Sequence, residues 1–317
     1  MKNEDDIQYY RTNSMQMTLI KQINAVLICE NLLNPCYLCA IIFLSLKRIL
    51  SKKMNVHLLK KLAAEKAVDE ILSGMIVGLG TGSTVQFALE KISERIKNGE
   101  LKNIRCIPSS NQTEKDAIRL GIPLVTLNEV GSRLSAVSPE LSVDEAIQYQ
   151  VSSIQHPASS IIDITIDGAD EADEHLNLIK GGGGALLREK ILAQASKRLI
   201  IIVDESKLSK QLGTKWTVPV EVVQFAASVE QKYLESLGAK VVRRKNAEGK
   251  DYVTDENNFI LDANFGEIKN PEELAVLLNQ RAGIVEHGLF IGMTSELICA
   301  MNDGKVRIQK SEIRSKK

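Results

Sequence analysis

The segment ITIDGADEADEHLNLIKGGGGALLREK, residues 164–190, contains two aspartates and a lysine at short spacing. Asp167 and Asp170 stand three residues apart at the end of a β-branched run, and Lys180 ends a second apolar patch. Carboxylates held close together raise one another's pKa, so one of them can stay protonated and act as an acid near neutral pH. The alternative interpretation is a solvated turn in which an aspartate caps a helix.

Four consecutive glycines, at 181–184, follow Lys180. Each costs about 0.5–1 kcal/mol relative to alanine in regular structure, so the run makes sense where backbone passes close to a ligand. Lys180 can then place positive charge beside a phosphate or a developing oxyanion. Glu189 lies about one turn into the next predicted helix, where its side chain can point back toward the glycines. The alternative is a surface glutamate paired with Arg188 or Lys190.

The segment VGLGTGST, residues 77–84, has the composition of an anion-binding loop. Its alternating glycines allow a ligand to approach the backbone, and it opens onto a predicted helix whose N-terminus attracts phosphate. The hydroxyls of Thr81, Ser83 and Thr84 add hydrogen-bond donors. A dinucleotide fingerprint needs glycine where Ser83 stands, and no Gly-Lys pair follows as in a P-loop. A tight turn without a ligand remains the alternative.

Helical and strand patterns alternate from Met54 onward. Apolar residues at every fourth position between 59 and 71 predict a helix, and short buried runs at 75–77, 104–107 and 164–166 predict strands. Such alternation predicts an α/β fold with a Rossmann-like parallel sheet covered by helices on both faces. Each chemical motif follows a predicted strand, so all of them should meet at the carboxyl edge of the sheet, where open α/β sheets bind ligands.

The pattern changes after Trp216, and this change predicts a second domain. Residues 218–290 have the order strand, helix, strand, strand, helix, strand, which is typical of a small α+β ferredoxin-like domain. We expect the catalytic domain to comprise residues 54–217 plus 291–317. Residues 131–160 are rich in serine without a sustained period, and we interpret them as an unusual insertion in that domain.

Bulk composition argues against several classes of protein. Lysine plus arginine and aspartate plus glutamate both number 40 and only 4% of residues are aromatic, so we expect no nucleic-acid partner. Five scattered cysteines do not suit a disulfide framework, which favours a reducing compartment. Cys36 and Cys39 have the spacing of a redox or zinc pair but lack a second ligand pair, and we expect no metal.

The first 53 residues differ from the rest, and we interpret 1–53 as an atypical, dispensable N-terminal extension. Its apolar stretch from Cys36 to Leu46 spans about eleven residues, too few to cross a bilayer. Acidic residues near the start disfavour a transit peptide. We therefore expect no membrane partner.

Five motifs in order, VGLGTGST, IDGADE, LIKGGGGALLREK, VDESK and VPVEVV, resemble those of the A-type ribose-5-phosphate isomerases. The likeness runs from about Met54 to Val306, apart from residues 131–160. It implies an enzyme, an aldose–ketose isomerase that interconverts D-ribose 5-phosphate and D-ribulose 5-phosphate without metal or cofactor. It also implies carbohydrate metabolism in the non-oxidative pentose phosphate pathway, a cytoplasmic location and a homodimer or homotetramer.

The resemblance assigns roles to individual residues. It implies that Glu189 is the general base, moving a proton between C2 and C1 through a cis-enediolate. Asp167 and Asp170 assist ring opening and proton transfer at the sugar hydroxyls, and Lys180 with the glycines from Gly181 to Gly183 contacts substrate and stabilises developing negative charge. The substrate-binding residues that it implies are Thr81, Gly82, Ser83, Thr84, Gly168, Ala169, Gly181, Gly182, Gly183 and Lys207.

Two other functions compete with this hypothesis. Related folds serve as sugar-phosphate sensors, although no helix-turn-helix partner is present and the acid–base set is intact. A different enzyme on a similar scaffold, such as an amino-sugar-phosphate deaminase or a coenzyme A transferase, is the third hypothesis. The insertion at 131–160 has two interpretations, an extra surface loop or translated sequence foreign to the natural protein, such as a retained intron.

Overall fold

The computed structural model describes residues 55–131 and 160–311. The expected extension at 1–53 and nearly all of the expected insertion at 131–160 lie outside the described residues, as do Cys36 and Cys39. Among the helices in the described ranges, none combines the length and the apolar character needed to cross a membrane.

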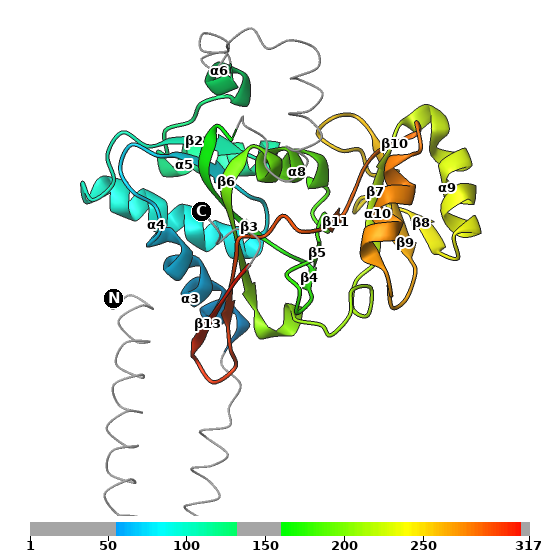
Figure 1. Cartoon of the computed structure of the whole chain (residues 1–317). Helices are drawn as coiled ribbons and strands as arrows, with labels where there is room; N and C mark the ends of the chain where they lie inside the picture. Colours follow the sequence, from blue (N-terminus) through cyan, green and yellow to red (C-terminus); the bar gives the residue numbers. More distant parts are fainter. Residues whose placement is uncertain (1–54, 132–159, 312–317) are drawn as a thin grey trace, which may run out of the picture. The chain divides into compact units, whose positions relative to one another are not determined.

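A six-stranded sheet forms the larger part of the described chain, in the order β13-β12-β6-β3-β1-β2 (Figure 1). All neighbouring strands are parallel except β13, which pairs antiparallel with β12 at one edge. The strands are β1 (Ile76–Leu79), β2 (Arg105–Pro108), β3 (Ile162–Gly168), β6 (Ser196–Asp204), β12 (Glu296–Ala300) and β13 (Val306–Lys310). The expected Rossmann-like α/β fold is confirmed, and the antiparallel edge strand adds to it.

Helices cover both faces of this sheet, because its central strands are apolar on both sides. In β6, Leu199 and Ile201 lie in one buried cluster with Ala193 of the helix that follows the glycines, while Ile200 and Ile202 are fully buried on the opposite face. The helices are α3 (Val56–Val68), α4 (Ser83–Lys97), α5 (Asn111–Leu120), α6 (Leu127–Gly131) and α8 (Leu186–Gln194).

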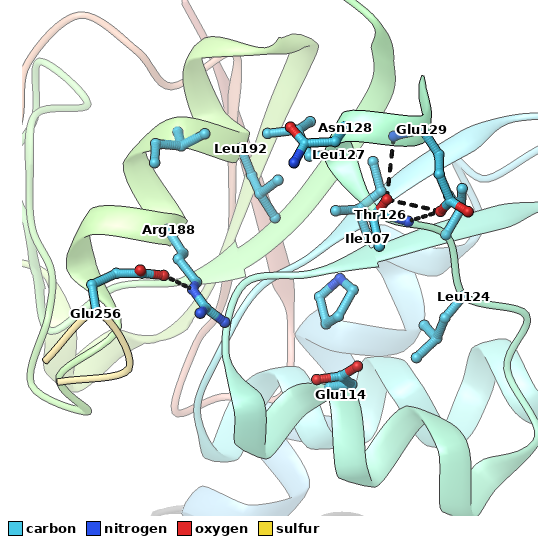
Figure 2. Close-up of a pocket in the computed structure, with 13 residues that line it drawn as sticks. Ile107, Glu114, Leu124, Thr126, Leu127, Asn128, Glu129, Arg188, Leu192 and Glu256 are labelled. Atoms are coloured by element: carbon cyan, nitrogen blue, oxygen red, sulfur yellow. Dashed lines mark hydrogen bonds and ion pairs between the residues drawn. The ribbon is translucent and has the colours of Figure 1, made fainter. Parts of the chain in front are cut away.

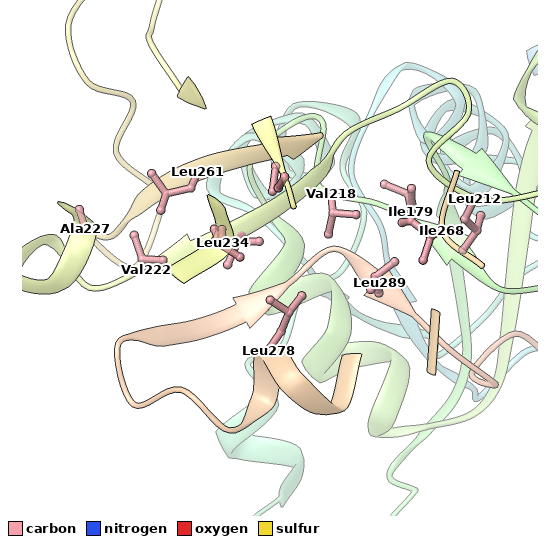
Figure 3. Close-up of a cluster of buried hydrophobic side chains, with 13 residues drawn as sticks. Ile179, Leu212, Val218, Val222, Ala227, Leu234, Leu261, Ile268, Leu278 and Leu289 are labelled. Atoms are coloured by element: carbon pink, nitrogen blue, oxygen red, sulfur yellow. The ribbon is translucent and has the colours of Figure 1, made fainter. Parts of the chain in front are cut away.

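A second, antiparallel sheet has the order β10-β7-β9-β8 and carries two helices. Its core joins Leu234 and Leu278 of the helices to Val218, Val222 and Leu261 of the strands (Figure 3). This is the expected ferredoxin-like order of elements, whereas the domain boundaries near residues 218 and 291 stay a prediction. The elements are β7 (Val218–Val222), α9 (Ala227–Ser236), β8 (Lys240–Arg243), β9 (Phe259–Asn264), α10 (Pro271–Asn279) and β10 (Ile284–His287).

The run GIVEHGLF, residues 283–290, is divided between two sheets, although the order predicted for residues 218–290 ends in a single strand. β10 ends at His287, and β11 (Leu289–Phe290) joins a small sheet with β5 (Leu178–Ile179) and β4 (Glu171–Ala172). Gly288 lies at the break, where an added Cβ would be 2.3 Å from the carbonyl oxygen of Lys180. The division follows from this close approach of distant backbone, which local apolar patterning does not reveal.

Candidate active site

The carboxyl ends of β1, β3 and β6 lie side by side, because β3 pairs in parallel with both neighbours. The loops that follow these strands and the glycine loop between β5 and α8 enclose a polar cavity of about 110 Å³. Every predicted site residue except Asp167 lines this cavity, and one unpredicted residue, Lys60, joins them. The predicted residues in the wall are Thr81, Gly82, Ser83, Thr84, Gly168, Ala169, Asp170, Lys180, Gly181, Gly182, Gly183, Glu189 and Lys207.

A buried ammonium group lies between two carboxylates at the inner end of the site. Nζ of Lys180 is 3.0 Å from Oδ2 of Asp167 and 3.2 Å from Oε2 of Glu189, and it donates to the carbonyl of Gly168 at 2.7 Å. All three charged side chains are at most 5% exposed. Oε2 of Glu189 accepts no hydrogen bond from the described residues, despite the nearby ammonium. It is therefore an oxygen that can take up a proton.

The electrostatics of this cluster favour a proton on Glu189 near neutral pH. Burial raises the pKa of Glu189 to about 8, with a further contribution from Asp167, although Lys180 opposes the rise. Burial also raises the pKa of Asp167, again against the effect of Lys180. Burial disfavours the ammonium of Lys180, but Asp167 and Glu189 outweigh it and raise its pKa. Lys180 thus stays charged while Glu189 changes its protonation state in the working pH range.

Asp167 lies behind the cavity wall rather than in it. Its Oδ1 accepts hydrogen bonds from the amides of Thr81 (3.1 Å) and Gly168 (2.7 Å), and its Oδ2 contacts Lys180. Gly80 makes this possible, since an added Cβ there would lie 2.1 Å from Oδ1 of Asp167. Asp167 therefore ties the β1 loop to Lys180, and whether it also acts on substrate stays a prediction.

Asp170 faces the cavity and is held by the glycine loop. Its Oδ2 accepts a hydrogen bond from the amide of Gly182 at 2.7 Å, and its own amide donates to the carbonyl of Ile179 at 2.9 Å. This carboxylate can therefore exchange a proton with a hydroxyl of a molecule bound in the cavity.

The outer end of the cavity is suited to an anion. α4 begins at Ser83 after Gly82, without a side-chain cap, so the positive end of the helix dipole faces the cavity. Nζ of Lys60 donates to Oγ of Ser83 at 2.8 Å, and Lys207 approaches from a short 3₁₀ turn after β6 (Glu205–Lys207). The hydroxyl of Thr81 instead bonds to the hydroxyls of Ser109 and Ser110, between β2 and α5, and of Thr113 on α5, so it positions the loop.

Lys60 was missed by sequence reasoning because it belongs to no motif. It lies on α3, beside Leu59 in the buried face, and resembles its neighbour Lys61 in every local respect. Only the packing of α3 against α4 brings Lys60 to the loop after β1. A lysine one position from an apolar helix stripe was the sole signal in the sequence.

A larger hollow of about 510 Å³ lies elsewhere, between α6 and α8 (Figure 2). It is lined largely by apolar side chains such as Leu124, Leu127 and Leu192, and its arginine, Arg188, pairs with Glu256 at 2.6 Å. None of the predicted site residues lines it. Volume alone therefore does not locate the chemistry.

Other ionisable and metal-binding residue types form no competing centre. Among the described residues, no group of three or more histidine, cysteine, aspartate or glutamate side chains could hold a metal ion. His287 is buried, and burial together with Lys190 lowers its pKa to about 3, so it stays neutral. Burial raises the pKa values of the Cys106 and Cys299 thiols to about 12, and both are free.

The fold and the site together define the class of protein. It is an α/β enzyme whose small polar cavity joins a helix N-terminus suited to an anion to a buried carboxylate–lysine cluster suited to proton transfer.

Comparison with known proteins gives the family. Residues 136–304 match the family model of ribose 5-phosphate isomerase A (phosphoriboisomerase A). The chain is 52% identical over 246 residues to ribose-5-phosphate isomerase A of Desulfatibacillum aliphaticivorans, covering 78% of this chain and 94% of that protein. It is 44% identical over 253 residues to the Chloroflexus aurantiacus protein of the same name, covering 80% and 94%. This chain belongs to the ribose 5-phosphate isomerase A family.

Solved structures agree with this assignment. The ribose 5-phosphate isomerase of Plasmodium falciparum superposes with a TM-score of 0.68 at 39% identity, covering 81% of this chain and 99% of that one. A D-ribose-5-phosphate isomerase in complex with phospho-erythronic acid gives a TM-score of 0.70 at 33% identity, covering 81% and 100%.

Proposed function

We propose that this protein interconverts D-ribose 5-phosphate and D-ribulose 5-phosphate by proton transfer through a cis-enediolate. The observation that carries the proposal is the buried carboxylate of Glu189. Glu189 lines the cavity, its Oε2 lies 3.2 Å from the ammonium of Lys180, and its pKa is raised to about 8. A base with a pKa close to the working pH is well matched to abstracting a proton next to a carbonyl.

The polarity of the cavity orients a sugar phosphate in one direction. The phosphate binds at the N-terminus of α4, where loop amides, Lys60 and Lys207 supply hydrogen bonds and positive charge. The carbonyl end of the open-chain sugar then extends toward Lys180 and Glu189 at the inner end of the cavity. Membership of the family and the relatives' names support this choice of substrate.

Each chemical step can be written with the residues at the inner end. Glu189 removes the proton from C2 of the open-chain aldose, and the electron pair forms the C1–C2 double bond while negative charge develops on O1. Lys180 stabilises that charge. Asp170 assists the transfer of the proton from O2 to O1. Glu189 then returns its proton to C1, which yields the ketose and restores the carboxylate.

Asp167 supports these steps from behind the wall. By pairing with Lys180 it keeps the ammonium charged, and by raising the pKa of Glu189 it strengthens that base. Assistance to ring opening falls to Asp170, whose carboxylate faces the bound sugar.

Replacement of the base tests the proposal. Purified wild type should convert ribose 5-phosphate to ribulose 5-phosphate, and Glu189→Gln should lower kcat by about 10²- to 10⁴-fold with KM nearly unchanged. Glu94→Gln, on the outer surface of α4, is the matched control and should behave as wild type. Tight binding of ribose 5-phosphate by a wild type with no turnover would instead indicate a sensor.

Reaction in deuterated water tests the enediolate separately. Proton transfer through Glu189 lets the abstracted proton exchange, so deuterium should enter C1 of the ribulose 5-phosphate product. Complete retention of the substrate hydrogen under all conditions would point to a hydride shift and overturn this mechanism.

A place in the non-oxidative pentose phosphate pathway, a cytoplasmic location and homo-oligomeric assembly form part of the same proposal.

A further inference from the structure

The carbonyls of the glycine loop are held from outside the cavity by two residues of the connection between β8 and β9. Arg244, directly after β8, donates through Nη1 to the carbonyl oxygens of Gly181 (2.8 Å) and Gly182 (3.1 Å). The hydroxyl of Tyr252 donates to the carbonyl of Gly183 at 3.2 Å. Three successive carbonyls therefore have side-chain donors, none of which comes from the large sheet.

Arg244 is itself fixed in position. Its Nε and Nη2 bond to the two carboxylate oxygens of Asp262 on β9, at 2.9 and 2.5 Å, and its amide donates to the carbonyl of Ile260 at 2.9 Å. Only a planar guanidinium can serve a bidentate carboxylate and two carbonyls together, since an ammonium has three donors and no fixed fork.

Tyr252 is coupled to Arg244 and to the loop. The amide of Tyr252 donates to the carbonyl of Arg244 at 2.9 Å, and the guanidinium lies 5.9 Å from the tyrosine ring centroid. At Gly184, where φ is +84°, an added Cβ would be 2.2 Å from the tyrosine hydroxyl oxygen. The loop thus packs directly on Tyr252.

Fixing a carbonyl also fixes the next amide, because a peptide unit is planar and its C=O and N–H point in opposite directions. With the Gly181 carbonyl held by Arg244, the Gly182 N–H points to Asp170 in the cavity wall, at 2.7 Å. With the Gly182 carbonyl held in the same way, the Gly183 N–H turns away from Arg244 as well. No residue of the described part of the chain accepts a hydrogen bond from this N–H.

We propose that Arg244 is a positioning residue of the isomerase, which aims the amide of Gly183 at the negative charge that develops on the substrate and holds the amide of Gly182 on Asp170. This inference rests on the proposed function, because the charge in question is that of the enediolate. Arg244 touches no substrate and acts only through the peptide units of the glycine loop. Preorganised amides of this kind stabilise a transition state more than a ground state.

Kinetics of Arg244 variants test the proposal in the full chain. Arg244→Met should lower kcat about 10- to 100-fold while KM changes less than about threefold, because misaimed donors lose transition-state contacts. Arg244→Lys should not rescue kcat, since it restores the charge without the fork. Arg243→Met is the matched control: this arginine pairs with Asp251 at 3.5 Å, contacts no loop carbonyl, and its loss should leave kcat unchanged.

Two inhibitors distinguish a loss of amide orientation in the glycine loop from a general loss of structure in the cavity. Phospho-erythronic acid carries a carboxylate at the end opposite its phosphate, whereas inorganic phosphate probes only the outer end of the cavity. In Arg244→Met the inhibition constant of the former should rise about tenfold and that of the latter should not change. An equal rise for both, or a kcat per folded molecule equal to that of wild type, would overturn the proposal.

A milder variant decides the matter if Arg244→Met does not fold. Asp262→Asn keeps the shape of the side chain but weakens its two-point contact with Arg244, so it should fold and lower kcat several-fold with KM unchanged. An unchanged kcat in Asp262→Asn would then overturn the proposal. Failure of the wild type itself to turn over ribose 5-phosphate would instead sink the proposed function.

Discussion

Two buried lysines lie near the same aromatic ring and yet sit in opposite electrostatic settings. Nζ of Lys180 is 5.5 Å, and Nζ of Lys190 is 5.0 Å, from the ring centroid of Phe290. Both residues are 3% exposed. Burial and an aromatic neighbour therefore do not distinguish them, and the difference lies in the carboxylates around each.

Lys190 has one carboxylate and Lys180 has two. Lys190 donates to Glu286 and to the carbonyl of His287, both at 2.6 Å, and burial lowers its pKa against the effect of Glu286. Lys180, between Asp167 and Glu189, has a raised pKa. The charge of Lys190 is balanced by one carboxylate, so this pair has a structural role. Around Lys180 one carboxylate is in excess, so the cluster can gain or lose a proton.

Of the variants that test this comparison, Lys180→Met should have the largest effect on turnover. Lys180→Met removes the cation that faces the developing oxyanion, and kcat should fall about 10²- to 10³-fold. Steady-state assays with ribose 5-phosphate measure this loss. A smaller loss of kcat in Lys180→Met than in Lys190→Met would contradict the comparison.

Lys190→Met should act on stability rather than on chemistry. It leaves the carboxylate of Glu286 without its partner, so the free energy of unfolding should fall by about 3 kcal/mol. Urea denaturation measures the change, while kcat well below the melting temperature should stay within a few-fold of wild type. Adding Glu286→Gln should recover part of the stability, because the unpaired charge is then absent.

A third lysine, Lys60, sharpens the comparison because it is partly exposed and lies at the outer end of the cavity. Lys60→Met removes one charge-assisted contact to the phosphate, so KM should rise about tenfold with kcat nearly unchanged. The adjacent Lys61→Met is the control, since its ammonium pairs with Glu65 at 3.9 Å on the helix surface. A fall in kcat alone would place Lys60 in the chemistry rather than in binding.

The smallest expected effect is a shift of the pH profile. Glu189 works as a base when deprotonated, so kcat/KM should rise with pH and level off above its pKa of about 8. Asp167→Asn removes a negative charge that raises this pKa, so the acid limb should move to lower pH. A limb that stayed in place or moved upward would contradict the assigned coupling.

Much of the fold and of the candidate site could be predicted from local sequence patterns. The apolar run at 164–166 predicted the strand that is β3, and the motif order placed Lys180, Asp170 and Glu189 near one edge of a sheet. Residues of the predicted site came together because each motif ends a strand or begins a helix, and parallel strands share a carboxyl edge.

What the sequence did not show depends on contacts between distant segments. Lys60 reaches the cavity only through the packing of α3 on α4, and Asp167 lies behind Lys180 because the ammonium of Lys180 reaches the end of β3, at the carbonyl of Gly168. The guanidinium of Arg244 looks like any strand-end charge until its two carbonyl partners are seen. The periodicity of apolar residues describes one helix or strand at a time, so it does not predict contacts between distant segments.

The break at Gly288 has a consequence for the order in which this protein folds. The carbonyl of Gly288 accepts from the amide of Lys180 at 2.9 Å, and its own amide donates to the carbonyl of Pro219 at 2.8 Å. The ammonium cluster is therefore built on pairings between segments far apart in the chain, and closing such long loops is slow compared with forming local helices. During synthesis Glu189 and Lys180 emerge well before Gly288, whose carbonyl holds the amide of Lys180. The active site must therefore be among the last parts of the protein to form.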